Sequence, residues 1–504
     1  MIPFIKCLVF CLLCLSTRSE AATTTTSDTD KKESFQEEVV ETSHSVKING
    51  VEVPYKAIAG TIVLKDEQNN PKAKLFYVSY SRSDIPESGK RPITFCFNGG
   101  PGASAVWLQL GALGPRRVVL AENGYGDPPY GLQDNEFSLL DVTDLVFIDP
   151  VSTGYSREAP GEDPKQFHGY EEDIKSVGEF IRLYTTKYGR WDSPKFLAGE
   201  SYGTLRAVGL AEYLYDQTFY YVNGIILVSS LLHYQTIDFS PGNDLPYPLF
   251  LPSYTAAAWY HGKLSKDLQA KSLSDVLEEV EKFALEDYAL ALMKGDSIQE
   301  DQRKKIGDRL AYYTSLSPAF IQQNNLRVDE FHFMKELLKD QNRVLGRFDS
   351  RVKGITMDTC SWNFDYDPSM ENVLGLFTAT FYQYAQKELG WKKDDNYKVL
   401  SNVWPWNYGT KANNQYLYVG ESIKKVMTKN PNTKVFIASG YYDLATPYFG
   451  TEYTFTHLGL DPSLKKNISP YYYDAGHMMF TDRTSLAKLK KDLSTWMIQS
   501  VPQS

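Results

Sequence analysis

Six short apolar runs separated by long stretches constrain the fold of this 504-residue chain more than any other feature. Runs of this kind, without polar alternation and ending in glycine or a polar residue, are typical of strands buried on both faces of a parallel sheet. Helical patterns lie between several of them, for example at 170–189. Strands alternating with helices predict an α/β fold. The runs are PITFCFNGG (92–100), DLVFIDP (144–150), KFLAGES (195–201), NGIILVSS (223–230), KVFIASG (434–440) and ISPYYYDAG (468–476).

Two further regions divide the chain around these strands. From about residue 45, apolar and polar side chains alternate around Asn-Gly and Asn-Pro turns, which predicts an antiparallel meander. Between about 235 and 395 the pattern is mostly helical. We therefore expect an α/β core (45–234 and 396–504) interrupted by a mainly helical insertion (235–395) that forms a cap over the C-terminal edge of the sheet. Aromatic segments such as 247–254 are expected to wall the site, with ordinary core packing as the alternative.

The N-terminus has the pattern of a targeting segment. Lys6 precedes an apolar run at 7–15, and small residues suited to cleavage follow. The run is much shorter than the roughly 20 residues that span a bilayer, so residues 1–22 are predicted to be a secretory signal rather than a membrane anchor. Residues 23–44 are small and charged, and a disordered leader is expected. We expect export to the periplasm or the exterior, or to a vacuole or lysosome in a eukaryote, with no membrane insertion after signal removal.

Charge and cysteine content exclude some functions and leave other questions open. The net charge is −9 without a basic block, which argues against nucleic acid as a partner. Beyond the signal, only Cys96 and Cys360 remain, as one bridge or as two thiols, and Cys96 lies in an apolar run where a buried thiol is expected. The sequon at Asn467 does not decide glycosylation, and the oligomeric state is not fixed by the sequence.

The pentapeptide 199–203, Gly-Glu-Ser-Tyr-Gly, indicates a nucleophile. It directly follows the apolar run KFLA and precedes a helical pattern, which is the strand–turn–helix setting of a nucleophile elbow. The glycines permit a sharp turn that would raise the Ser201 hydroxyl above the end of the sheet. A plain glycine turn is the alternative interpretation.

A serine nucleophile needs a base, and the base needs an acid that orients it. Of seven histidines, only His477 follows a strand-like run into a glycine turn. Asp443 ends another apolar run, whereas Asp474 is so close to His477 in sequence that it would share its loop. The order Ser201, Asp443, His477 is that of the α/β-hydrolases. All three residues would leave the C-terminal ends of parallel strands, where such sheets place their sites.

Acyl hydrolysis also needs hydrogen-bond donors for an oxyanion. One is the backbone N–H of Tyr202, and the glycine-rich loop after the first buried strand offers the second at Gly100. This loop lacks the Lys-Ser or Lys-Thr of a phosphate loop. Neither HExxH nor paired cysteines occur outside the signal, so we expect neither a metal nor a cofactor.

Five collinear motifs resemble those of the serine carboxypeptidases of the α/β-hydrolase fold. They are NGGPGASA (98–105), the segment at 149–157, GESYG (199–203), SGYYDLATP (439–447) and DAGH (474–477). The resemblance covers the chain from about residue 45 to its end. It implies an α/β-hydrolase core with a central, mostly parallel sheet and a helical cap insertion. It implies the triad Ser201, Asp443 and His477, and oxyanion donors at Gly100 and Tyr202. Finally, it implies that Asn98, Gly99 and Glu200 bind the C-terminal carboxylate of a peptide.

Three positions depart from the pattern of that family. Phe97 stands where a tryptophan is usual, and Ala103 stands where many members have a disulfide cysteine. Ala112 takes the place of a second glutamate, so the carboxylate-binding network is incomplete by the family's standard. The substrate class is therefore less well determined than the triad.

Three functional hypotheses follow from the sequence. The first is a serine carboxypeptidase that releases C-terminal residues from peptides through an acyl-enzyme on Ser201, with a preference for hydrophobic residues. The second is an esterase or acyltransferase that uses the same triad on non-peptide acyl groups, since a fold alone does not fix the substrate. The third is a catalytically silent binding protein. Peptides with free and amidated C-termini distinguish the first two, and a fluorophosphonate probe of Ser201 tests the third.

Overall fold

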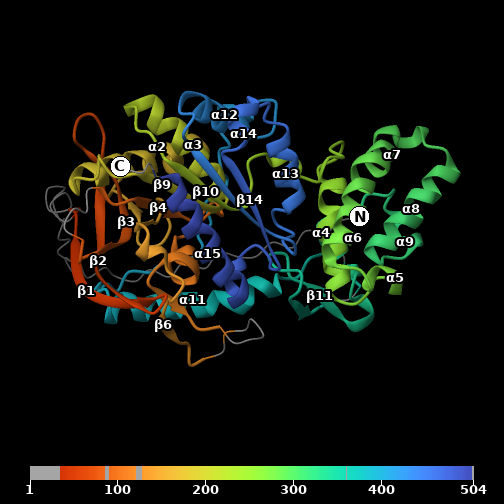
Figure 1. Ribbon diagram of the computed structural model, residues 1–504, viewed down its shortest axis with the longest axis horizontal. Helices are drawn as coiled ribbons and strands as arrows, with labels where there is room; N and C mark the ends of the chain where they lie inside the picture. Colours follow the sequence, from red (N-terminus) through yellow and green to blue (C-terminus); the bar gives the residue numbers. More distant parts are fainter. Residues whose placement is uncertain are drawn as a thin grey trace, which may run out of the picture.

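The computed structural model describes residues 35–85, 90–120, 126, 128–358, 360–361 and 363–501. The predicted signal peptide (1–22) and the leader up to residue 34 lie outside these ranges. Strands of the described part form one large mixed sheet in the order β1-β2-β3-β7-β4-β9-β10-β13-β14, with β8 beside β3. Figure 1 shows this sheet in one half of the molecule and a group of helices, α4 to α9, in the other.

The half of the sheet from β7 to β14 is parallel. Every neighbouring pair in it runs in the same direction, and β4, β7 and β10 are buried along their whole length. Each strand coincides with one of the six apolar runs, so the prediction of a mostly parallel sheet is confirmed. The strands are β7 (Asp144–Ile148), β4 (Ile93–Phe97), β9 (Lys195–Ser201), β10 (Gly224–Ser230), β13 (Lys434–Gly440) and β14 (Ile468–Tyr473).

The other half of the sheet is an antiparallel meander of β1 (Val39–Ile48), β2 (Val51–Lys65) and β3 (Pro71–Arg82), with the short β8 (Arg157–Glu158) beside β3. The meander was expected, but the prediction of a disordered leader over 23–44 is wrong from residue 39 onward. β1 pairs with β2 along its whole length. The two are joined by Asn49 and Gly50, both with positive φ, as a tight hairpin turn requires.

Helices cover both faces of the sheet. One face packs against α2 (Tyr170–Lys187), α3 (Tyr202–Thr218) and α12 (Gly420–Lys429). The opposite face packs against α11 (Pro368–Lys387) and α15 (Arg483–Ser500). Two smaller helices, α13 (Tyr448–Thr456) and α14 (Pro462–Lys465), belong to the connection from β13 to β14. A separate two-stranded ribbon is formed by β5 (Arg116–Val118) and β6 (Leu132–Asp134). No helix among the described residues is long and apolar enough to cross a membrane.

The insertion has its own hydrophobic cluster, which extends from Leu249 to Leu345 and takes in residues at and before α13. In contrast, α11 lies within the predicted insertion (235–395) but packs on the sheet; in Figure 1 it runs along the lower edge of the core. The separately packed body is therefore shorter than the predicted insertion. Its elements are α4 (Pro246–Tyr260), α5 (Lys266–Gln269), α6 (Leu273–Phe283), α7 (Ala289–Lys294), α8 (Glu300–Thr314), α9 (Pro318–Gln323), α10 (Glu330–Glu336), β11 (Arg343–Leu345) and β12 (Lys353–Ile355).

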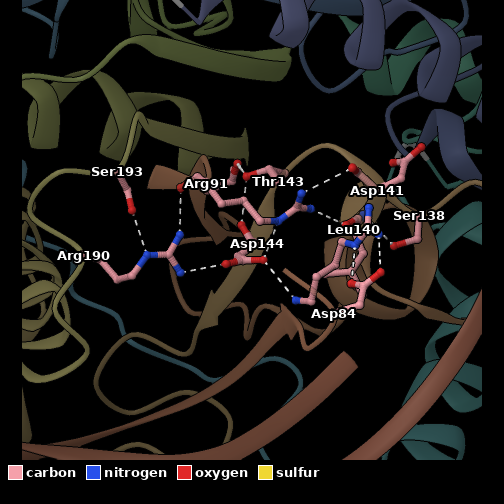
Figure 2. A network of polar contacts seen from close by, with 11 residues as sticks. Asp84, Arg91, Ser138, Leu140, Asp141, Thr143, Asp144, Arg190 and Ser193 are labelled. Atoms are coloured by element: carbon pink, nitrogen blue, oxygen red, sulfur yellow. Dashed lines mark hydrogen bonds and ion pairs between the residues drawn. The ribbon is translucent and has the colours of Figure 1, made fainter. Parts of the chain in front are cut away.

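A buried ionic cluster joins the amino ends of three neighbouring parallel strands (Figure 2). Asp144, the first residue of β7, accepts hydrogen bonds from Arg91 Nε at 2.8 Å and from Arg190 Nη1 at 2.7 Å. Arg190 also donates to the carbonyl of Arg91 at 2.8 Å. All three side chains are at most 8% exposed. Because Arg91 precedes β4 and Arg190 precedes β9, the cluster fixes the end of the sheet opposite to Ser201.

Both cysteines of the described part are free thiols. Cys96 is buried within β4, as expected, and Cys360 is exposed beyond β12. The alternative of a bridge between them is therefore wrong.

Candidate active site

Ser201 lies at the junction of β9 and α3. Its backbone has φ 58° and ψ −129°, a conformation that non-glycine residues rarely adopt. The turn is so tight that a Cβ on Gly199 would lie 2.0 Å from the carbonyl oxygen of Gly203. A Cβ on Gly203 would lie 2.8 Å from the carbonyl oxygen of Phe97. The two glycines therefore allow the elbow to form against the loop after β4, and Ser201 lines a cavity at this edge of the sheet.

His477 and Asp443 form a buried pair beside this cavity. His477 Nδ1 lies 2.8 Å from Asp443 Oδ2, and both side chains are at most 3% exposed. The other oxygen of Asp443 accepts the backbone N–H groups of Ala445 (2.7 Å) and Thr446 (2.9 Å). An ionised carboxylate only accepts hydrogen bonds, so the ring proton belongs on Nδ1. Nε2 is then free to take a proton.

The surroundings of His477 fix its ring and shift its proton affinity. The ring stacks on Phe348 with centroids 4.7 Å apart, and the backbone N–H of His477 donates to the Phe348 carbonyl at 2.6 Å. Burial opposes the charged form of His477, but the charge and hydrogen bond of Asp443 outweigh it and raise the pKa of His477. The Glu200 carboxylate also raises this pKa, whereas the Arg347 guanidinium lowers it.

The glycine loop after β4 lies directly against the start of α3. A Cβ on Gly99 would lie 2.5 Å from the backbone nitrogen of Tyr202, and Gly100 has φ +99°. Gly99, Gly100 and Tyr202 all line the cavity with Ser201. The structure thus brings together the loop and the backbone amide that the sequence predicted as oxyanion donors.

Arg206 on α3 holds this loop in place, and the sequence analysis missed it. Its side chain is 1% exposed, pairs with Asp173 on α2 at 2.8 Å and donates to the carbonyl of Asn98. The guanidinium lies over the rings of Phe97 and Tyr202, 5.5 and 5.3 Å from their centroids. An arginine within the otherwise apolar stretch at 205–211 was the available signal, since a buried charge needs a buried partner.

Asn98 and Glu200 form the predicted carboxylate-binding group next to Ser201. The Asn98 side-chain amide donates to Glu200 Oε2, while Asn98 Oδ1 accepts the N–H of Leu108 at 3.1 Å. Glu200 Oε1 is buried and has no hydrogen-bond partner among the described residues. Burial raises the pKa of Glu200 to about 7, although His477 and Asn98 act in the opposite direction. Ala112 is buried in the short helix η2 (Leu108–Leu113), and its methyl group offers no proton to share.

The cavity in front of these groups has a volume of about 270 Å³ and mainly apolar walls. Residues 247–254 do not line it, so the expectation that this segment walls the site is wrong. Helix α4, which contains it, is apolar on all sides and is buried in the cluster of the insertion instead. Large apolar residues that line the cavity are Trp107, Leu231, Tyr234, Ile237, Phe348, Met370, Leu400, Trp404 and Met478.

The described residues contain no metal-binding cluster. Within these ranges, no group of three or more acidic, histidine or cysteine side chains could hold a metal ion. The absence of a metal or cofactor requirement stays a prediction.

A serine at a strand–turn–helix elbow, at the carboxyl edge of a parallel sheet and beside a buried His–Asp pair, defines the α/β-hydrolase class. The solved structure of Kex1, a prohormone-processing carboxypeptidase from Saccharomyces cerevisiae, has this fold in common with the chain. It superimposes with a TM-score of 0.54 at 18% identity, covering 88% of this chain and 91% of that one. The chain belongs to the serine carboxypeptidase family, which it matches over residues 50–489. The predicted fold and family resemblance are confirmed.

Individual relatives match over different lengths. Serine carboxypeptidase-like 33 of Arabidopsis thaliana is 30% identical over 155 residues, or 30% of each chain. The pheromone-processing carboxypeptidase KEX1 of Saccharomyces cerevisiae is 33% identical over 155 residues, or 29% of this chain and 20% of that protein. Less than a third of each of these two relatives is thus matched. A putative serine carboxypeptidase-like 30 of Arabidopsis thaliana is 22% identical over 432 residues, or 84% of this chain and 78% of that protein.

Proposed function

We propose that the protein is a serine carboxypeptidase that releases C-terminal residues from peptides through an acyl-enzyme on Ser201. The observation that carries this proposal is the buried pair of His477 and Asp443, 2.8 Å apart, beside a cavity that Ser201 also lines. Membership of the serine carboxypeptidase family supports the same assignment.

Each step of the proposed reaction is assigned to a group of the site. Ser201 Oγ attacks the carbonyl carbon of the last peptide bond, and His477 Nε2 takes the hydroxyl proton. The backbone N–H groups of Gly100 and Tyr202 stabilise the oxyanion. His477 then gives the proton to the departing amine, which leaves as a free amino acid. Water, deprotonated by His477, attacks the remaining ester, and the peptide acid departs with Ser201 restored.

Recognition of the chain terminus would fall to Asn98, Gly99 and Glu200. With its pKa raised to about 7, Glu200 is protonated in mild acid and can donate a hydrogen bond to the terminal carboxylate of a peptide. The unpartnered Oε1 of Glu200 is available for this contact. A blocked or amidated terminus has no negative charge to receive that hydrogen bond.

The test compares the activity of the wild type with that of S201A on N-terminally blocked peptides whose C-termini are free or amidated. We expect S201A to reduce turnover by several powers of ten, as the loss of a triad residue does. The free-acid peptides should be the better substrates. Near-normal activity of a folded S201A protein, checked by circular dichroism, would remove Ser201 from the mechanism.

One observation favours an esterase or acyltransferase as a second candidate. Ala112 stands where the family has a second glutamate, and Glu200 is the only acid among the described residues that line the cavity. Equal turnover of free-acid and amidated peptides, together with faster turnover of simple acyl esters, would favour this candidate.

We further propose that the chain is exported through the predicted signal at 1–22. It would then act outside the cell, in the periplasm, or in a vacuole or lysosome. Edman sequencing of the secreted protein tests the cleavage site.

A further inference from the structure

The cavity wall contains one charged side chain that the proposed reaction does not use. Arg347 is the only arginine or lysine among the described residues that line the cavity. It follows β11 and directly precedes Phe348, whose ring stacks on His477. A cation in a mainly apolar cavity is costly unless a partner compensates it.

The backbone of Arg347 is held on both sides. Its N–H donates to Asp367 Oδ1 at 3.0 Å, and its carbonyl accepts the N–H of Leu444 at 3.0 Å. Leu444 directly follows Asp443. Arg347 is therefore fixed relative to the proposed triad, and its charge is close enough to lower the pKa of His477.

The guanidinium itself is poorly satisfied. Its Nε is buried and has no hydrogen-bond partner, and the nearest carboxylate oxygen within the described ranges is Glu330 Oε1, 3.9 Å from Nε. An arginine carries five N–H donors in a planar fork that matches a carboxylate. About 30% of the side chain is exposed, and the residue lines the cavity.

Glu330 compensates this charge only in part. Burial raises the pKa of Glu330 to about 7, because it outweighs the attraction of Arg347, and Asp329 and Asp238 act in the same direction as burial. In mild acid Glu330 is therefore largely neutral, and the described residues offer no other carboxylate in ion-pair contact with the guanidinium. Two other titratable groups lie close to Arg347: Asp367, which accepts its backbone N–H, and His477, whose charged form repels it.

We propose that Arg347 binds the side-chain carboxylate of a substrate residue next to the scissile bond, so that the enzyme prefers peptides with aspartate or glutamate there. This inference rests on the proposed carboxypeptidase function. It assigns the terminal α-carboxylate to Asn98, Gly99 and Glu200, and the acidic side chain to Arg347. The apolar walls remain able to accept neutral residues.

The test uses N-terminally blocked peptides in matched pairs. The two members of a pair differ only in having Glu or Gln at the last or the penultimate position. At pH 5.5 we expect the wild type to favour Glu over Gln about tenfold to a hundredfold in kcat/KM, as for hydrogen bonds to charged groups. R347Q should bring this ratio close to one, and R347K, which keeps the charge but loses the fork, should give an intermediate ratio. R343Q is the matched control. Arg343 lies on the same hairpin but donates to backbone carbonyls outside the cavity, so its loss should leave the ratio unchanged.

The pH profile of the ratio gives a second readout that a structural role of Arg347 would not produce. The preference should vanish as pH falls through about 4, where the glutamate of the peptide takes up a proton. It should also weaken as pH rises through about 7, because ionised Glu330 then competes for Arg347. E330Q should abolish the weakening at high pH and leave the loss at low pH in place.

Binding measurements separate this inference from the proposed function. Titration calorimetry of S201A and of S201A/R347Q with the same peptides should show tighter binding of the Glu peptides only when Arg347 is present. An equal Glu-to-Gln ratio with and without Arg347 overturns the inference, and release of the terminal residue from the Gln peptides shows that the proposed function still stands. R347Q could instead change the ratio between free-acid and amidated peptides and leave the Glu-to-Gln ratio unchanged. Arg347 would then bind the α-carboxylate, and the inference would be overturned as well. Failure of the wild type to cleave any peptide counts against the proposed function, and the calorimetry still decides the role of Arg347.

Discussion

Glu200 and His477 lie in one buried site, and each changes the proton affinity of the other. The proposed mechanism needs Glu200 protonated and His477 neutral, which are opposite demands on pH. As pH rises through about 7, Glu200 loses its proton and the terminal carboxylate of the substrate meets a like charge. As pH falls through the raised pKa of His477, the general base becomes protonated. The dependence of kcat/KM on pH is therefore expected to be bell-shaped, with macroscopic values that belong to the pair.

E200Q should change both sides of this profile. The amide cannot ionise, so KM for free-acid peptides should no longer rise through pH 7. Removal of the negative charge also withdraws one of the influences that raise the pKa of His477, so the acidic limb should move to lower pH. Steady-state kinetics from pH 4 to 9 measure both effects. Amidated peptides serve as the control, because their KM should depend little on pH in either protein. An unchanged KM profile for the free acids would show that Glu200 does not bind the terminus.

The sequence predicted those site residues whose position follows from the topology of a parallel sheet. Ser201 ends β9, and Asp443 and His477 come shortly after β13 and β14. Parallel strands bring their carboxyl ends to one edge. Arg347 and Phe348 follow a short hairpin strand of the insertion, for which no such rule exists. Their approach to His477 depends on how the insertion packs, through contacts such as that of Leu444 with the Arg347 carbonyl.

Among single elements, the strands buried on both faces were predicted best. β4 and β10 consist mainly of apolar residues and are buried throughout, and burial explains that pattern without reference to neighbours. The first part of β1, residues 39–44, was missed because β1 is an edge strand with one exposed face, so its polar composition looks like that of a disordered segment. Helix α4 was assigned to the wrong place, because an apolar sequence shows that a surface is buried but not which surface covers it.

The amino ends of β4, β7 and β9 depend on Asp144, and D144N tests this at the scale of elements. The substitution leaves Arg91 and Arg190 buried without a carboxylate, so we expect a loss of about 3–5 kcal/mol in the free energy of unfolding. The site lies at the other edge of the sheet, so kcat/KM of the folded protein should change little. Guanidinium chloride unfolding measures the loss. D308N is the control, because Asp308 pairs with Lys304 on the surface, where such a pair contributes about 0–1 kcal/mol. A loss no larger than that of D308N would contradict the role of the cluster.

At the scale of the whole molecule, four buried or partly buried carboxyl groups share one property. Burial raises the pKa of Asp149, Glu200, Glu281 and Glu330 to about 7. A carboxyl whose pKa is raised on folding destabilises the folded state once it ionises. The loss begins above the ordinary pKa of the group, about 4.5 for a glutamate and about 3.8 for Asp149, and is complete above about 7. We therefore expect the folded protein to be most stable in mild acid. This agrees with protonated Glu200 and with a vacuole or lysosome, one of the proposed destinations.

The contact between the insertion and the core provides the sharpest test of this dependence. Glu281 on α6 of the insertion accepts a hydrogen bond of 2.6 Å from Tyr448 on α13, and Glu452 on α13 adds a like charge that raises the pKa of Glu281 further. The pKa of Glu452 is itself raised by burial, although Tyr472 donates to its carboxylate. When both carboxyls ionise, α6 and α13 carry charges of the same sign across their contact.

E281Q keeps an oxygen for Tyr448 but cannot ionise. The melting temperature of the wild type should fall as pH rises from 5 to 8, and the melting temperature of E281Q should fall less. The variant should therefore melt a few degrees higher than the wild type at pH 8. At pH 4 the two proteins should melt at similar temperatures, because Glu281 is then protonated in both the folded and the unfolded wild type. Scanning calorimetry at the three pH values measures this difference. E286Q, at an exposed position just after the same helix, is the matched control and should follow the wild type. If E281Q loses stability with pH as steeply as E286Q, ionisation at the contact between α6 and α13 does not weaken the attachment of the insertion to the core.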